Sequence, residues 1–167
     1  MKKFIAGIVL GLLIVPLAIF LYFALGMAPV AQSDPPMPFE KRLAKMALRP
    51  HYREAAGLKA PIAADETAFV AGAKLYKENC AVCHGLPNQQ PSAIARGLSP
   101  DPPQLFRTEK MVTDDPAGET YWKVANGMRL TGMPGFRGPM NETQLWQVAL
   151  LLAHADKLPP AAQDALK

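Results

Sequence analysis

Cys80-Ala81-Val82-Cys83-His84 is the stretch of this sequence that decides the fold. Its pattern, C-x-x-C-H, is typical of covalent c-type haem attachment. Two thiols three residues apart on one helical turn can each bond a vinyl group on the same edge of a porphyrin. The imidazole of His84 is then tethered beneath the iron, where a ring nitrogen can serve as the proximal ligand. We therefore expect one covalent haem c, held by Cys80, Cys83 and His84.

Two other interpretations of the cysteine pair are weaker. A structural zinc site needs about four ligands, and the chain has only these two cysteines, with His51 and His154 isolated from them. A thioredoxin-like C-x-x-C would need a strand–helix–strand context, and the surrounding sequence has no such pattern. The haem interpretation is the one that accounts for both cysteines and the histidine that follows them.

An apolar run at the N-terminus predicts a membrane span. Lys2 and Lys3 precede an uncharged, mostly apolar stretch from Phe4 to about Ala28. A bilayer needs ~20 such residues, and a secretory signal peptide usually has an apolar region of only ~7–15. Pro29 also disfavours cleavage nearby, and Pro16 is tolerated in membrane helices. We expect residues 1–28 to be an uncleaved transmembrane signal anchor.

The orientation of this anchor follows from the haem. Lys2 and Lys3 favour a cytoplasmic N-terminus. Basic residues after the span favour the opposite orientation. They begin, however, near the distance beyond which the positive-inside rule no longer counts charges. Covalent haem attachment in bacteria takes place outside the cytoplasmic membrane. We therefore expect a single-pass protein of the bacterial cytoplasmic membrane, with its haem domain on the periplasmic side.

The charge of the chain is unevenly distributed. Residues 1–64 hold eight Lys and Arg against three Asp and Glu, whereas residues 65–167 hold ten against eleven. The basic character therefore belongs to the anchor and linker, and nothing points to nucleic acid. Residues 65–167 are enough for one small domain with a thin core. A covalently held haem would supply the apolar body that such a core lacks.

Residues 29–64 read as a proline-rich, basic linker. The segment 33–38 holds three prolines and should be extended. Phe39, Leu43 and Met46 then fall at helical spacing among basic residues, which predicts a short amphipathic helix over 39–48, ended by Pro50. This helix has three interpretations: it packs on the haem domain, it lies on anionic lipid headgroups, or it docks a partner subunit. His51 is expected to be solvated.

Two longer helices should frame the domain. Asp65 or Thr67 can cap a helix that runs towards Cys80. Gly72 lies inside it, where glycine costs roughly 1 kcal/mol relative to alanine. A close crossing by another helix would explain this glycine, and the candidate is the apolar segment from Glu142 to about Lys157. Tyr76, four residues after Gly72, falls on the same face. His154 is expected at the surface.

The segments between these helices are rich in proline and glycine. Little regular structure fits residues 87–103, but a backbone carbonyl there could accept the N–H of the proximal histidine. A third short helix is expected from Gly118 to Asn126, with Gly127 as its stop.

Met133 is the candidate for the sixth iron ligand. It lies in the Gly-rich, proline-stiffened segment Thr131-Gly132-Met133-Pro134, which can hold a thioether at a fixed place over a porphyrin. A methionine is more often a packing residue, and the chain has eight. The rivals are Met111, Met128, which should pack inward, and Met140, which lies just before the last helix.

Taken together, these motifs resemble a class I cytochrome c domain. The resemblance covers roughly residues 65–158. Its motifs, in order, are Gly72 with Tyr76, the Cys80–His84 stretch, Tyr121-Trp122 with Asn126-Gly127, Thr131 to Pro134, and a closing helix with Trp146. The closing helix has Leu151 where an aromatic residue is frequent. The resemblance implies an all-α, cytochrome c-like domain whose iron is bound by His84 and Met133 from opposite faces.

A haem closed by histidine and methionine has no open position for a substrate, so we expect an electron carrier and not an enzyme. Its partners would be redox proteins: a quinol-oxidising complex or dehydrogenase as donor and a terminal reductase or oxidase as acceptor. Two alternatives stay open. The protein could be a fixed haem subunit of a membrane dehydrogenase, reductase or oxidase, or a haem-based sensor with a labile methionine ligand.

Overall fold

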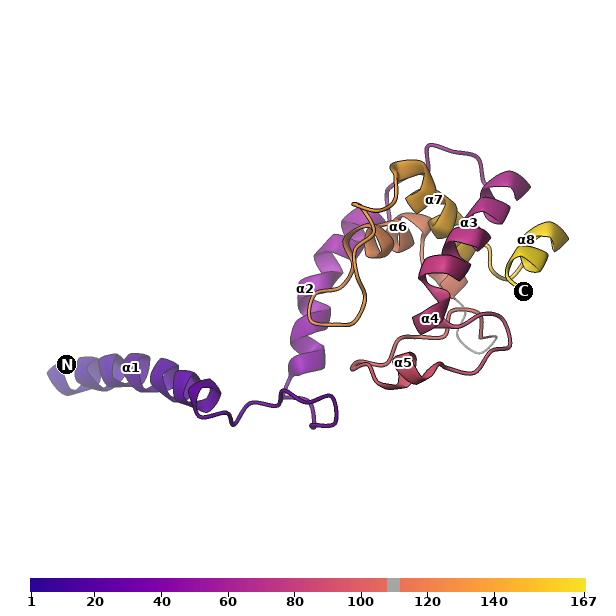
Figure 1. Cartoon of the computed structure of the whole chain (residues 1–167). Helices are drawn as coiled ribbons and strands as arrows, with labels where there is room; N and C mark the ends of the chain where they lie inside the picture. The colour runs from indigo at the N-terminus through magenta and orange to yellow at the C-terminus, as the bar shows by residue number, and fades with distance from the viewer. Residues whose placement is uncertain (108–111) are drawn as a thin grey trace. The chain divides into compact units, whose positions relative to one another are not determined.

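The computed structural model describes residues 1–107 and 112–167, and the regular elements within these ranges are helical, as expected (Figure 1). The chain divides into two compact units, Met1–Leu43 and Ala44–Lys167. The elements are α1 Lys2–Ala24, α2 Glu40–Ala55, α3 Glu66–Asn79, α4 Ala81–His84, α5 Ala93–Arg96, the 3-10 turn η1 Val112–Asp114, α6 Ala117–Asn126, α7 Glu142–Ala153 and α8 Pro160–Ala165.

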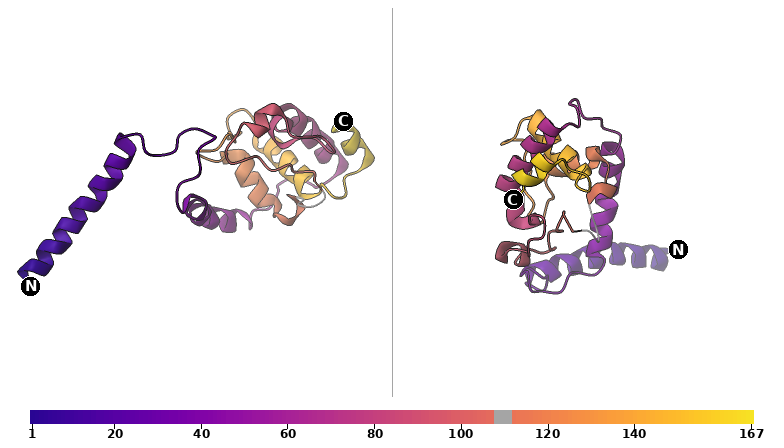
Figure 2. Two further views of the ribbon diagram at one scale, coloured as in Figure 1. Left: turned by 90° about the horizontal axis from the view of Figure 1, so that it is seen from below. Right: turned by 90° about the vertical axis from the view of Figure 1, so that its right-hand side faces the viewer.

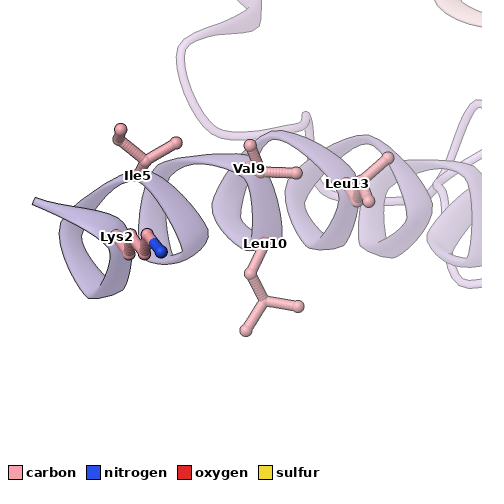
Figure 3. A pocket seen from close by; sticks show the side chains of 5 residues that line it. All are labelled: Lys2, Ile5, Val9, Leu10 and Leu13. Atoms are coloured by element: carbon pink, nitrogen blue, oxygen red, sulfur yellow. The ribbon is translucent and has the colours of Figure 1, made fainter.

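Helix α1 is the apolar N-terminal helix, and it is long and apolar enough to cross a membrane. Pro16 lies within it without ending it, as expected for a membrane helix. Side chains such as Ile5, Val9 and Leu13 project from its surface and enclose no core of their own (Figure 3). These exposed apolar side chains are consistent with a membrane span.

The core of the second unit is built on the crossing of α3 and α7 (Figure 1). The two backbones come close to one another at Gly72. A β-carbon at this position would lie 2.8 Å from the carbonyl carbon of Gln147 and 3.2 Å from the β-carbon of Leu151. The predicted crossing is therefore confirmed. Tyr76 is fully buried one turn later, and the helices of this unit stay grouped in both further views (Figure 2).

Local capping fixes where the core helices start and stop. The Asp65 carboxylate accepts the N–H of Ala68 at 2.9 Å and caps α3. Asn141 and Gln144 form a reciprocal capping box at the start of α7. Gly127, at φ +65°, ends α6 as expected. The α6–α7 contact is closed by Tyr121 and Trp146, whose stacked rings lie 4.2 Å apart.

The end of the chain differs from expectation. Helix α7 ends at Ala153, four residues short of Lys157, because His154 leaves the helical conformation at the cap. After α7, Pro159 and Pro160 begin a further helix that was not expected, α8, which packs on α3. Proline suits the first turn of a helix, where its missing N–H has no partner to lose. His154 is half-buried against Phe69, with ring centroids 5.1 Å apart, and is not simply a surface residue.

Helix α2 also corrects the sequence analysis, because it continues through Pro50 to Ala55. Proline removes one helical hydrogen bond and normally ends or kinks a helix. Here the part after Pro50 packs on α6. His51 stacks on Trp122 at 5.3 Å, Tyr52 meets the same ring edge-on at 5.6 Å, and Ala55 is buried. His51, expected to be solvated, is thus exposed on one side and stacked on the other.

Tyr52 is the side chain that should contribute most to this packing. Its ring lies 4.8 Å from the ammonium of Lys123, and its hydroxyl donates to the sulfur of Met128 at 3.8 Å. We expect Tyr52→Ala to lower the free energy of unfolding by about 2 kcal/mol, through lost packing and cation–π contact. Tyr52→Phe keeps the ring and should cost less than about 1 kcal/mol, because sulfur is a weak acceptor. Thermal unfolding of both variants measures the difference, and equal losses would contradict the ring's role.

Candidate haem site

The Cys80–His84 stretch forms one tight turn at the C-terminal end of α3. Cys80 ends α3, with its N–H donating to the carbonyl of Tyr76, and its own carbonyl accepts the N–H of His84 at 2.9 Å. The short helix α4 follows at once. The structure therefore brings Cys80, Cys83 and His84 onto one helical turn, which is the arrangement that the spacing predicts.

Both thiols in this turn are unpaired and half-buried. Burial, together with the neighbouring Cys83, raises the pKa of the Cys80 thiol to about 12. At neutral pH the free Cys80 sulfur is therefore a protonated thiol. Addition to a vinyl group at the haem edge is a chemistry that suits such a pair.

His84 is held in one orientation by the proline-rich loop. Its Nδ1 lies 2.8 Å from the carbonyl oxygen of Pro103, which accepts the ring N–H when Nδ1 carries the proton. This confirms that a carbonyl of the 87–103 loop serves the histidine. Burial lowers the pKa of His84, opposed by the bond to Pro103, so the neutral ring is favoured. The other ring nitrogen, Nε2, then offers its lone pair to a metal.

Three further contacts fix this turn against its surroundings. The hydroxyl of Tyr76 donates to the carbonyl of Gly85 at 2.7 Å, which ties the end of the turn to α3. The side-chain amide of Gln104 donates to the carbonyl of Cys83 at 3.1 Å. Gly85 itself has φ +70°, and a β-carbon there would meet the Gln104 side chain. Glycine is therefore required at the residue that follows His84.

The surroundings of the turn fit a large apolar group. Leu86, Leu105, Phe106 and Phe136 pack against the core and yet keep part of their surface uncovered. Val82 and Ile94 are about half exposed nearby in the sequence. A cavity of about 370 Å³ opens beside His84. Leu86 and Phe106 line it together with polar side chains: Asn88, Gln89, Gln90, Gln104 and Arg107. Two unpaired thiols, an oriented imidazole and uncovered apolar side chains together match what a covalent haem requires.

Met133 lies on a separate loop that is closed at both ends. The N–H of Met128 donates to the carbonyl of Met133 at 3.1 Å, and the N–H of Met133 donates to the hydroxyl of Thr131. The N–H of Phe136 returns to the carbonyl of Val124 in α6 at 2.9 Å. Gly132 lies against the side chain of Leu98, which follows α5. This loop fixes the backbone of Met133 beside the segment that carries α5.

The rival methionines are placed differently. Met140 is buried in the core, 5 % exposed, and packs among the helices. Met128 is half-buried, and its sulfur already accepts the hydroxyl of Tyr52. Met111 lies outside the described residues. Met133 is half-buried, with a sulfur that makes none of the hydrogen bonds found among the described residues.

Sequence reasoning did not single out Pro103 or Gln104 at the site, or the contact of Tyr52 with Met128. The prolines of the 87–103 segment indicated an ordered loop, but nothing in the sequence says which carbonyl faces His84. Tyr52 lies far from Met128 in the chain, and no periodicity links the two. Only the folded chain reveals such long-range contacts.

Comparison with known proteins adds one match. Residues 67–152 match the family described as "Cytochrome C oxidase, cbb3-type, subunit III". The matched region begins at the start of α3 and ends in α7, so it includes the Cys80–His84 turn and the Met133 loop. The comparison with curated proteins found no match.

Proposed function

Because the chain belongs to the family described as cytochrome c oxidase, cbb3-type, subunit III, it carries a c-type cytochrome domain with covalent haem c, and we propose that it is a membrane-tethered electron carrier. The observation that carries this proposal is the Cys80–His84 turn, with its imidazole held by Pro103. When bound, the haem supplies a one-electron couple between ferric and ferrous iron. The chain's own residues hold it, orient its ligands and exclude water.

The proposal assigns Cys80 and Cys83 to the thioether bonds, His84 to the proximal position and Met133 to the sixth. The Met133 loop is closed onto α6 on one side and bordered by Leu98 on the other, which suits a ligand that keeps its place in both oxidation states. A thioether favours ferrous iron and raises the reduction potential. A site closed on both faces passes electrons and does not bind substrate.

The location follows from α1 and from the chemistry of attachment. We propose that α1 is retained as a single-pass anchor in the cytoplasmic membrane of a bacterium and that the haem domain faces the periplasm. The donor would then be a quinol-oxidising complex or a dehydrogenase, and the acceptor a terminal reductase or oxidase. Confinement to the membrane raises the rate of encounter with partners in the same plane.

Replacing Met133 tests the ligand assignment directly. We expect the ferric parent protein to show the weak long-wavelength iron–thioether band and Met133→Ala to lose it. The reduction potential of the variant should fall by on the order of 100 mV, because the sulfur no longer favours ferrous iron. The ferrous variant should also bind carbon monoxide, which the parent should resist. Optical spectra and a redox titration measure all three.

Met128→Leu is the matched control, because it removes a thioether from the same loop. This variant should keep the band. If Met128→Leu loses the band and Met133→Ala keeps it, Met128 is the ligand. If the parent itself lacks the band and binds carbon monoxide readily, the open site favours a haem-based sensor.

The family description favours one second candidate, a fixed haem subunit of a terminal oxidase complex. Such a subunit would use the same haem ligands, so the site does not separate it from a free carrier. Purification from membranes in mild detergent does. Recovery with stoichiometric oxidase subunits supports the fixed subunit, and recovery alone supports the carrier.

A further inference from the structure

Helix α2 has two different faces. One face carries Tyr52 and Ala55, which pack on α6, and the half-buried Leu48. The contact is close: a β-carbon on Gly118 of α6 would lie 3.0 Å from the β-carbon of Leu58 and closer still to the carbonyl of Ala55. The C-terminal part of α2 is therefore held firmly on the domain that bears the haem site.

The opposite face of α2 carries a narrow, uncovered apolar stripe, with the exposed Glu54 on one of its flanks. At 100° per residue, Met46 and Pro50 lie about 160° around the helix from Leu48. Met46 is 61 % exposed, and Leu43, one turn earlier in the same helix, is 59 % exposed. Large exposed apolar side chains in a row are uncommon on a soluble surface unless something covers them.

A row of arginines borders this apolar stripe. Arg42, Arg49 and Arg53 follow at intervals of seven and four residues, which places them along one flank of the helix, and all three are exposed. Among the described residues, the ion pairs involve Lys123 with Asp115 and Glu119, and Lys167 with Asp164. The arginines of α2 are in none of them, so their charges face outward.

The occupant that fits this pattern is an anionic lipid surface. A basic amphipathic helix with a narrow apolar face is typical of helices that lie in the headgroup region, and each cation there is attracted by anionic lipid. Residues 25–39 join α2 to the apolar helix α1 and can extend at most about 50 Å. When α1 lies in a bilayer, it keeps α2 close to the lipid surface. A contact between α2 and lipid that would be weak alone then forms often, because the tether raises its effective concentration.

We propose that α2 lies on the bilayer, with Leu43 and Met46 among the headgroups and Arg42, Arg49 and Arg53 on lipid phosphates. Because its other face is fixed to α6, the helix holds the haem domain in one orientation above the membrane. This inference goes beyond the proposed function, since it concerns lipid contact and holds whichever redox partner the domain serves.

Fluorescence of the full chain in nanodiscs tests the contact. The native thiols are used by the haem, so Met46→Cys accepts a single polarity-sensitive label. Discs of phosphatidylcholine alone are compared with discs that also contain phosphatidylglycerol. We expect the label to shift to the blue and to be quenched by nitroxide lipids in the anionic discs, and high salt to reverse both. A label at Ala161→Cys, on the exposed side of α8, serves as the matched control and should change little.

Charge reversal separates electrostatic lipid binding from other causes. Arg49→Glu and Arg53→Glu are introduced together into the chain labelled at Met46→Cys. Each lost cation should lower the ratio of inserted to exposed label about fivefold, so the pair should lower it by at least about 25-fold. Arg49→Lys with Arg53→Lys should keep it. The proposal is overturned if the Met46 label is quenched no more than the Ala161 label, if charge reversal has no effect, or if protection appears only when a redox partner protein is added.

Discussion

A chain with Cys80→Ala and Cys83→Ala should carry no haem that survives denaturing electrophoresis. The two thiols lie on one helical turn and are unpaired, and thioether bonds to the haem cannot form without them. The haem would then be held by axial ligands alone and would leave the unfolded chain. In-gel detection of haem in the parent and in the double variant measures this outcome.

The same change should also weaken the fold. Several apolar side chains around the turn, including Leu105 and Phe106, are only partly covered by protein. Burial of apolar surface contributes about 25 cal/mol per Å², so the loss of the group that covers them lowers the melting temperature of the domain. Met133→Ala is the control, because it removes the proposed sixth ligand and leaves both thioethers. Covalently bound haem in the double variant would contradict the assignment of the two cysteines.

The parts of the fold that the sequence predicts are those set by local chemistry. The cap at Asp65, the stop at Gly127 and the turn from Cys80 to His84 each depend on residues within four positions of one another. Gly72 predicted a contact between distant segments because a glycine inside a helix is costly unless another backbone comes close. In the structure, the backbone that comes close to Gly72 is the carbonyl group of Gln147.

The parts that could not be predicted depend on contacts between distant residues. Pro50 is a local signal to end α2, but the stacking of His51 and Tyr52 on Trp122 outweighs it. The carbonyl that holds His84 belongs to Pro103, 19 residues away. Such pairings carry no pattern in a single sequence, because any of several carbonyls in the loop has the same local chemistry.

Residues 29–64 are not a plain linker throughout, because they include α2. A flexible tether sets only the reach of a domain, whereas α2 has one face packed on α6. An electron carrier on a flexible tether can present its haem edge in many directions. If α2 lies on the bilayer, as proposed above, the haem edge faces one direction, which favours partners in the same membrane over soluble ones.

Gly72→Val should have the largest effect on folding of any single substitution in the core. A β-carbon at this position would lie 2.8 Å from the carbonyl carbon of Gln147, closer than side chains and backbone approach in proteins. Helices α3 and α7 would have to separate along their main contact, around which Ala73, Tyr76 and Leu151 are fully buried. Overpacking of a rigid core costs about 1–3 kcal/mol and more where backbone must move, so we expect at least about 3 kcal/mol.

The separation of α3 from α7 should also displace the haem site. Helix α3 leads directly into the Cys80–His84 turn, and Tyr76 holds that turn through its hydrogen bond to Gly85. Denaturant unfolding of the holoprotein measures the loss of stability, and the ferric spectrum reports the ligands. Gly138→Val is the matched control: a β-carbon on this glycine would meet no described atom within 4 Å, and its φ is not positive, so the same added bulk should change stability by less than about 0.5 kcal/mol. Equal tolerance of both substitutions would mean that the close crossing of α3 and α7 does not limit the fold.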